Sequence, residues 1–224
     1  MEVLWFVGVI LVVIAGVVLS FYLRAKRRKE FAAFAASYGL QYSAPDPFGV
    51  IEWPFRLFSR GDGRGAENVV WGDWQGQNVV AFDYWYFERH RDSKGHTRKT
   101  YYRFCCAQIE VPAAFPPLEI APEGFLSRLA DFVGLDDIDF ELEEFNRRWN
   151  VRGAEAKFAY ELVDSRMIRW LVSLDMRISF EVVGNRLLAY QRKVPAVGLA
   201  PLIGVLMAFR QRIPRVAWNL YPTS

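Results

Sequence analysis

The 224-residue chain has little cysteine, and this scarcity limits where its bulk can reside. Its two cysteines, Cys105 and Cys106, are adjacent. Neighbouring Cα atoms lie about 3.8 Å apart, which is shorter than the span of an ordinary disulfide. The chain also lacks an Asn-x-Ser/Thr sequon. Both absences agree with a body in a reducing compartment such as the cytoplasm.

The body of the chain also lacks an excess of positive charge. The whole chain has 28 Lys+Arg and 25 Asp+Glu, and its pI is near 8.9. Setting aside Glu2 and the five basic residues between Arg24 and Lys29 leaves 23 against 24, a net charge of about −1. Nucleic-acid-binding domains usually carry a basic stripe, so we expect no nucleic-acid partner. The composition does not define an oligomeric state.

Complete catalytic or metal-binding motifs are also missing. His90-Arg91-Asp92 resembles a kinase catalytic loop, but Thr97 stands where that loop has asparagine, and no glycine-rich loop or Asp-Phe-Gly accompanies it. His90 and His96 could hold a metal with Asp92, yet this set lacks the fourth ligand of a structural zinc site. We therefore interpret this segment as a polar loop and expect no metal.

Three other patterns have stronger structural than chemical interpretations. Cys105 and Cys106 lack a nearby base for nucleophilic catalysis. Gly61-x-Gly63-x-Gly65 lacks the following helix of a phosphate-binding loop and is expected to be a mobile turn. The acidic residues of Asp136–Glu144 alternate with apolar ones, which is typical of a solvated strand face. We expect no cofactor and no catalytic set.

An apolar run is the strongest signal present. Val3–Leu23 contains twenty-one residues without a charge, and a helix of that length reaches across a bilayer core of about 30 Å. The acidic start and long run disfavour a cleaved signal peptide, and an all-round apolar helix disfavours a soluble surface helix. We therefore predict an uncleaved signal-anchor, with the chain passing once through the cell's inner membrane.

A basic cluster follows the apolar run and predicts its orientation. Basic residues favour the cytoplasmic flank, which places the N-terminus outside and residues 30–224 in the cytoplasm. We divide the chain into residues 1–29, the anchor and basic stop, and residues 30–224, with a possible subdivision into 30–115 and 116–224. The cluster could also attract anionic lipid headgroups, although topology alone explains its charge. Its members are Arg24, Lys26, Arg27, Arg28 and Lys29.

Residue patterning predicts an α+β fold, with an antiparallel, β-rich first half and a second half that mixes helices and a hairpin. In the first half we expect a helix that continues the anchor, four strands and a proline-rich connection. They cover Glu30–Tyr38, Phe55–Ser59, Asn68–Trp74, Asn78–Glu88, Thr100–Val111 and Val111–Pro122, in that order.

In the second half we expect a helix, a strand, two short helices, a hairpin over Gly184-Asn185 and a final apolar helix. They cover Glu123–Val133, Asp136–Glu143, Ala154–Leu162, Arg166–Leu174, Ile178–Gln191 and Leu199–Arg210. The surrounding apolar stretch, Val194–Phe209, is too short and too rich in proline for a second span, so we interpret it as buried or as lying on the membrane surface.

Several short motifs resemble a group of bacterial membrane-anchored proteins of unknown function. The resemblance implies one membrane helix, a basic stop and a cytoplasmic domain, and it supplies no catalytic residues. The motifs are Asn68-Val69-Val70-x-Gly72, Phe82-Asp83-Tyr84-x-Tyr86, Glu144-Phe145-Asn146-Arg147, Trp149-Asn150-Val151-Arg152, Asp164-Ser165-Arg166-Met167 and Leu187-Leu188-Ala189-Tyr190.

Two functional hypotheses follow. The first is a binding or scaffolding domain at the cytoplasmic face, with the lipid bilayer, anionic headgroups or a membrane protein as partner. The alternative is a membrane-tethered enzyme with a pocket near Asp83, Tyr84, Asn146 and Arg147. Because an unpaired buried acid is costly, we expect Asp83 to pair with an arginine such as Arg103, or its aromatic strand to line a ligand groove.

Overall fold

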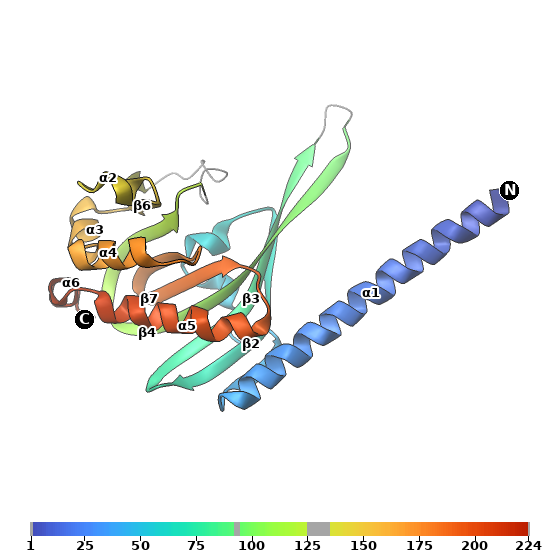
Figure 1. The fold of residues 1–224 in the computed structure, drawn as a ribbon, viewed down its shortest axis with the longest axis horizontal. Coiled ribbons are helices and arrows are strands. Elements are labelled where there is room, and N and C mark those ends of the chain that lie inside the picture. Colours follow the sequence, from blue (N-terminus) through green and yellow to red (C-terminus); the bar gives the residue numbers. More distant parts are fainter. Residues whose placement is uncertain (1, 92–94, 125–134, 224) are drawn as a thin grey trace.

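A single long helix leads into an α+β body in the computed structural model, which describes residues 2–91, 95–124 and 135–223 (Figure 1). Helix α1 (Glu2–Ser37) is continuous. Its apolar first part extends away from the body, whereas Phe31, Phe34 and Ala35 near its end are buried in the core. Gly39, with φ of +68°, lets the chain turn into the first strand. This confirms the predicted helical continuation of the apolar segment.

The body is built on an antiparallel sheet of seven strands. The strand order is β1-β2-β3-β4-β6-β5, and β7 pairs with β4. Strand β4 is the centre, because it pairs with β3 along its first half, with β6 near its end and with β7 along most of its length. The bounds are β1 (Gln41–Pro45), β2 (Gly63–Trp74), β3 (Gln77–Arg91), β4 (Thr97–Pro122), β5 (Asp136–Asp137), β6 (Trp149–Gly153) and β7 (Ser179–Arg192).

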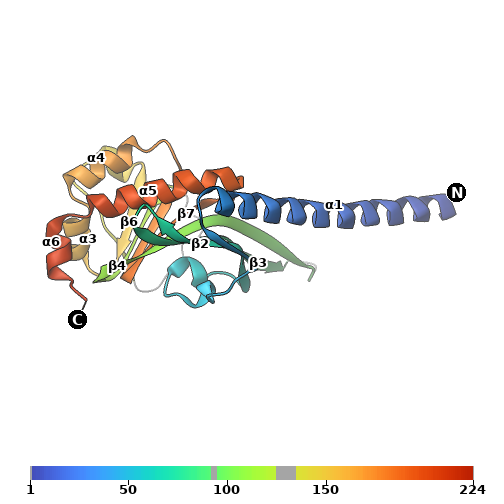
Figure 2. The same cartoon turned by 90° about the horizontal axis from the view of Figure 1, so that it is seen from below.

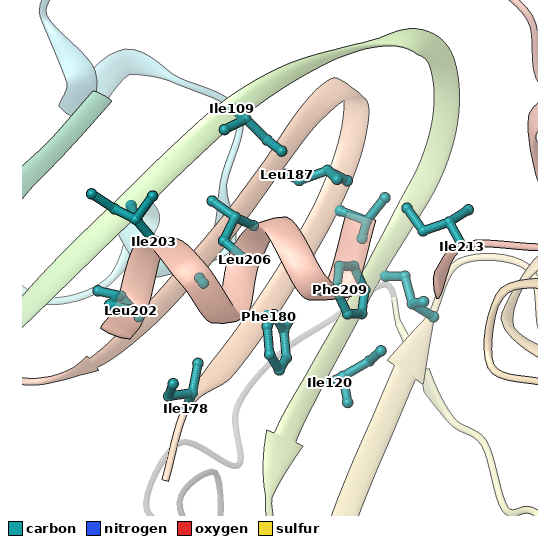
Figure 3. Close-up of a cluster of buried hydrophobic side chains, with 14 of the residues drawn as sticks. Ile109, Ile120, Ile178, Phe180, Leu187, Leu202, Ile203, Leu206, Phe209 and Ile213 are labelled. Atoms are coloured by element: carbon teal, nitrogen blue, oxygen red, sulfur yellow. The ribbon is translucent and has the colours of Figure 1, made fainter. Parts of the chain in front are cut away.

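Helices cover one face of this sheet. The face carries α5 (Leu199–Arg212), with α4 (Ser165–Ser173) beside it (Figure 2). The α5 side chains point at aliphatic and aromatic residues of β4 and β7 (Figure 3), so the predicted final helix packs on the core, the first of the two placements considered for the Val194–Phe209 stretch. The shorter helices are α2 (Glu143–Asn146), α3 (Ala156–Leu162), α6 (Arg215–Leu220) and the 3₁₀ turn η3 (Ala196–Gly198).

A segment with two 3₁₀ turns covers the opposite face. Turns η1 (Val50–Glu52) and η2 (Arg56–Ser59) lie over a second, aromatic-rich core (Figure 2). Phe58 packs there against Phe82 and Tyr84, with ring centroids 5.9 and 4.8 Å apart. The predicted strand at Phe55–Ser59 is therefore wrong. This segment forms the 3₁₀ turn η2, whose buried residues pack onto the sheet instead of pairing within it.

The two longest strands depart most from the sequence prediction. The proline-rich segment is the second half of β4, and no hairpin forms over Gly184-Asn185, because β7 is continuous. The β4–β7 register shifts between Glu110 and Leu118, with Phe115 opposite Gly184. Such irregularities accommodate prolines and bend a strand, and Gly184, with φ of +54°, allows the bend.

Smaller corrections concern local segments. Gly63 and Gly65 belong to β2, where a Cβ atom would meet the rings of Phe87 and Trp85, so they are packing glycines and not a mobile turn. The strand predicted for Asp136–Glu143 is limited to β5. The helix predicted for Glu123–Val133 falls mostly outside the described residues. The turn at Gln75-Gly76 and the helices α3, α4 and α5 confirm their predictions.

Candidate functional site

The N-terminal helix α1 and the sheet meet at a buried carboxylate, Asp83 of β3. Arg27 of α1 approaches it with two nitrogens, Nε 2.9 Å from Oδ2 and Nη2 2.8 Å from Oδ1. Lys193 places its Nζ 3.3 Å from Oδ2, just beyond the end of β7. The Asp83 side chain is 3% exposed and that of Arg27 is 11% exposed. The buried carboxylate thus faces two cations, of which Arg27 is largely buried and Lys193 is partly exposed.

Neighbouring polar groups complete this Asp83 cluster. Asn68 donates from Nδ2 to Asp83 Oδ2 at 3.1 Å, and Tyr42 donates to Asn68 Oδ1 at 3.2 Å. Asn68 has φ of +55° at the register shift between Glu67 and Val70, so a bulge in β2 aims its amide inward. Asn68 thus holds the carboxylate in place beside Arg27, an arrangement suited to fastening α1 to the sheet.

Cys105 lies directly opposite Asp83 and belongs to the same cluster. Arg27 Nη2 lies 3.3 Å from its sulfur. Burial, followed by the negative charge of Asp83, raises the pKa of the thiol to about 11. Cys106 is also fully buried, on the other face. Both cysteines are therefore neutral thiols near pH 7, which disfavours nucleophilic chemistry.

The expected pairing of Asp83 with Arg103 is wrong. Arg103 lies opposite Trp85 and places its guanidinium over the Tyr101 ring, 5.1 Å from the centroid. Sequence reasoning missed Arg27 because its cluster had already been explained by topology. One signal was available: Arg27 precedes Phe31 by four residues and therefore shares its buried helical face. The guanidinium indeed lies 4.6 Å from the Phe31 ring centroid.

The other members of the basic cluster behave as solvated charges. Arg24, Lys26, Arg28 and Lys29 are exposed on α1. The cluster therefore contains two kinds of residue. Arg27 is a structural partner of the body, and the other four are available to water or to headgroups.

The remaining candidate residues do not gather around Asp83. Tyr84 points to the opposite face, where its hydroxyl donates to the Leu57 carbonyl at 3.0 Å. Asn146 clamps Phe140, donating to its carbonyl at 2.7 Å and accepting from its N–H at 3.0 Å. Arg147 lines a separate pocket of about 320 Å³ with Asp175. Asn146 and Arg147 lie in and beside α2, at the end of the body away from α1 (Figure 1).

A second buried ionic cluster, which sequence reasoning missed, lies under η2. Glu119 of β4 and Glu181 of β7 are directly opposite in register. Arg60 donates to Glu119 at 3.1 Å and the Tyr190 hydroxyl does so at 3.0 Å. Glu181 accepts from the backbone N–H groups of Arg56 and Leu57, at 2.6 and 3.0 Å. The available signal was an isolated acid inside each of two apolar stretches.

The two carboxylates of this Glu119–Glu181 cluster repel each other. Burial, and then the charge of Glu119, raise the pKa of Glu181 to about 8, against the opposing effect of Arg60. Burial likewise raises the pKa of Tyr190 well above its ordinary value. Glu181 consequently keeps its proton near neutral pH, and the cluster holds η2 against the sheet.

A groove at the base of the β3–β4 hairpin is the best-placed ligand site. It has a volume of about 830 Å³ and combines aromatic rings with three arginines, and its lining contains no acid among the described residues. This composition suits an anionic group attached to an apolar body. The lining residues are Tyr86, Thr100, Tyr101, Tyr102, Arg103, Phe104, Gly124, Arg177, Gln191, Arg192 and Val194.

These features define an α+β protein with one helix, within the described residues, that is long and apolar enough to cross a membrane. Its fold is similar to that of the mycobacterial trehalose monomycolate transport factor A, TtfA, with a TM-score of 0.62. The two share 15% sequence identity over 90% of this chain and 98% of that one, so the likeness is one of fold. No family model and no curated protein matches the chain.

Proposed function

We propose that this chain is a membrane-anchored accessory factor in the transport of cell-envelope lipids, acting by binding and not by catalysis. The main support for the proposal is the fold shared with TtfA along 90% of the chain, to which this chain adds its own long N-terminal apolar helix. The described body adds no cluster of groups with the geometry of a catalytic site, and its most promising groove suits an anionic amphiphile.

In this proposal α1 crosses the inner membrane once, with its N-terminus outside. Residues 30–224 lie in the cytoplasm, close to the inner surface. The exposed basic residues after Leu23 support this orientation, because basic flanks favour the cytoplasmic side. Two buried, free cysteines agree with a reducing compartment. Labelling of a Ser93→Cys variant from outside intact cells is expected to fail, and ready labelling would overturn the orientation.

The arginine groove is the proposed lipid-binding site within this function. Arg103 and Arg192 supply cationic groups, and the ring of Tyr101, 46% exposed, supplies an apolar surface. A headgroup phosphate or sulfate would accept hydrogen bonds from the guanidinium groups while the attached chain contacts the ring. This assignment explains why charged and aromatic residues occupy the same groove.

Lipid analysis of a depletion strain tests the function. Depleting the chain in its source bacterium is expected to raise the inner-membrane pool of an envelope lipid and lower its surface pool, as measured by mass spectrometry of separated fractions. The wild-type gene should restore the distribution. An Arg103→Glu/Arg192→Glu variant should not restore it, whereas the matched control Arg166→Glu/Arg169→Glu, on α4, should. An unchanged distribution on depletion would contradict the proposal.

The competing proposal is a membrane-tethered enzyme with a pocket near Asp83 and Asn146/Arg147. It has weaker support, because Asp83 is enclosed by Arg27, Lys193 and Asn68, and Asn146 is engaged by the Phe140 backbone. Turnover of a lipid or nucleotide substrate by the purified full chain, abolished by Arg147→Ala, would favour the enzyme over the transport factor.

A further inference from the structure

Among the described residues, the end of the β3–β4 hairpin is a two-stranded ribbon to which no third strand pairs, although the Arg89 N–H donates to the Asp62 side chain at 2.6 Å. Pairing of β3 with β2 ends at Phe87, opposite Gly63, and pairing of β4 with β7 ends at Phe104, opposite Arg192. Beyond these points, Glu88–Arg91 pairs only with residues 97–100 among the described residues. Isolated two-stranded hairpins are marginal in water, so a projecting ribbon of this kind gains order from whatever surface it meets.

The ribbon carries a strong excess of positive charge. Arg89, Arg91, Arg98 and Lys99 are all exposed, and Glu88 is the acid on the described part of the ribbon. The body as a whole is close to neutral, so this charge is concentrated at one projection. An anionic surface complements it, and a flat ribbon edge presents several cations to such a surface at once.

The ribbon also projects on the same side of the body as the membrane-side helix. In Figure 1 the hairpin rises from the body while the apolar part of α1 runs up and to the right toward the N-terminus. In Figure 2, after a quarter turn, both extend from the body to the right. The Asp83 cluster fixes the end of α1 to β3, the strand that continues into the ribbon. Insertion of α1 therefore brings the ribbon toward the bilayer surface.

We propose that the ribbon is a second membrane contact, whose occupant is the anionic phospholipid headgroup layer on the side of the membrane that holds the body. The contact requires only that α1 inserts into a bilayer. It does not depend on lipid transport, so this inference and the proposed function can fail separately. Electrostatic attraction of this kind is weakened by salt and requires anionic lipid.

The test uses the full chain in lipid nanodiscs with a fluorescent probe on an engineered cysteine. Cys105 and Cys106 are fully buried, so a Thr97→Cys variant takes the label selectively on the ribbon. A Lys157→Cys variant on α3, whose side chain is 78% exposed, provides the matched control at the far end of the body. In nanodiscs containing phosphatidylglycerol, lipid-phase quenchers should quench the ribbon probe at least about twofold more than the control probe.

Charge variants then separate this contact from simple tethering. Arg91→Glu/Arg98→Glu should remove the excess quenching, and Arg169→Glu/Arg215→Glu, with the same charge change at the other end, should leave it intact. High salt or pure phosphatidylcholine should also remove it. Equal quenching at residues 97 and 157, or quenching that ignores lipid charge, would overturn the proposal. Excess quenching of the ribbon probe that appears only after addition of native membrane extract would also overturn the proposal, because it would indicate a protein partner.

Discussion

Two buried ionic clusters lie on opposite faces of the sheet and differ in how their charges balance. In the Asp83 cluster, two cations face one carboxylate. In the Glu119–Glu181 cluster, two carboxylates lie side by side and face Arg60. Cys105 and Cys106, adjacent in sequence, point into the first and second face respectively.

The charge balance of each cluster indicates what that cluster does for the fold. Asp83 has its charge fully compensated, and its partners come from α1, β2 and the end of β7, so it fixes how three distant segments meet. The second cluster keeps a proton on Glu181, because burial disfavours its charged form and the carboxylate of Glu119 lies directly opposite on the neighbouring strand. One cluster therefore defines an attachment, and the other makes its face sensitive to pH.

Removal of Arg27 is expected to have the largest effect. Arg27→Ala leaves Asp83 buried with Lys193 as its remaining cation and Asn68 as its hydrogen-bond donor, and the loss of one partner from a buried pair costs about 3 kcal/mol or more. Urea unfolding of the full chain in detergent, followed by tryptophan fluorescence, measures it. Arg28→Ala removes an exposed arginine from the same helix and should change stability by less than about 0.5 kcal/mol. Equal effects of the two variants would show that the Asp83 cluster does not hold α1.

The second cluster is tested by its pH dependence. The pKa of Glu181 is raised to about 8, so the folded state binds this proton more tightly than the unfolded state does. Its contribution therefore falls as the pH rises from about 4.5 to about 8. Glu181→Gln removes that dependence. Relative to the wild type, the free energy of unfolding of the variant should therefore rise by roughly 1–3 kcal/mol across this pH range.

Chemical unfolding at several pH values measures how steeply the free energy of unfolding depends on pH. Loss of one backbone hydrogen bond in the variant adds a cost that does not change with pH, so it leaves this slope unaffected. Glu110→Gln, at an ion pair on the surface, is the control and should leave the slope unchanged. A wild-type slope that persists in Glu181→Gln would assign the proton to another group.

The adjacent cysteines report the two faces separately, with the smallest expected effect. In the wild type both should react slowly with maleimide, because both are fully buried and Cys105 has a raised pKa. Arg27→Ala should speed labelling of Cys105 about tenfold, equivalent to about 1.4 kcal/mol of easier local opening, and leave Cys106 unchanged. Peptide mass spectrometry distinguishes the two sites. Parallel acceleration of both would show that the two thiols are exposed only by global unfolding, and not by local opening of one face.

Much of the secondary structure was predictable, because it depends on local patterns. The apolar run, the spacing of Phe31 and Phe34 and the Gln75-Gly76 turn each specify an element without knowledge of the rest. The α+β class followed from them, whereas the choice between burial and the membrane surface for Val194–Phe209 did not. The prolines of β4 and the Gly184-Asn185 pair led to a wrongly predicted connection and a wrongly predicted hairpin. An irregular pairing between two long strands uses the same residue types as a loop or a tight turn.

The candidate site was less predictable, because it depends on contacts between distant segments. The predicted need for a partner at Asp83 was confirmed, since burial of an acid demands one. The identity of the partner required knowing that α1 returns to β3, 56 residues away. The Glu119–Glu181 pair depends likewise on the register of β4 and β7, which local patterning does not define.

The continuity of α1 has a mechanical consequence. Leu23, the last residue of the apolar run, precedes Arg27 by about one helical turn, so no flexible linker separates the apolar segment from the Asp83 cluster. If α1 inserts into a bilayer as proposed, its rotation or tilt must reorient the whole sheet by the same angle. A neighbouring membrane helix that selects one rotational setting of α1 would thereby select which face of the body is presented to the partner.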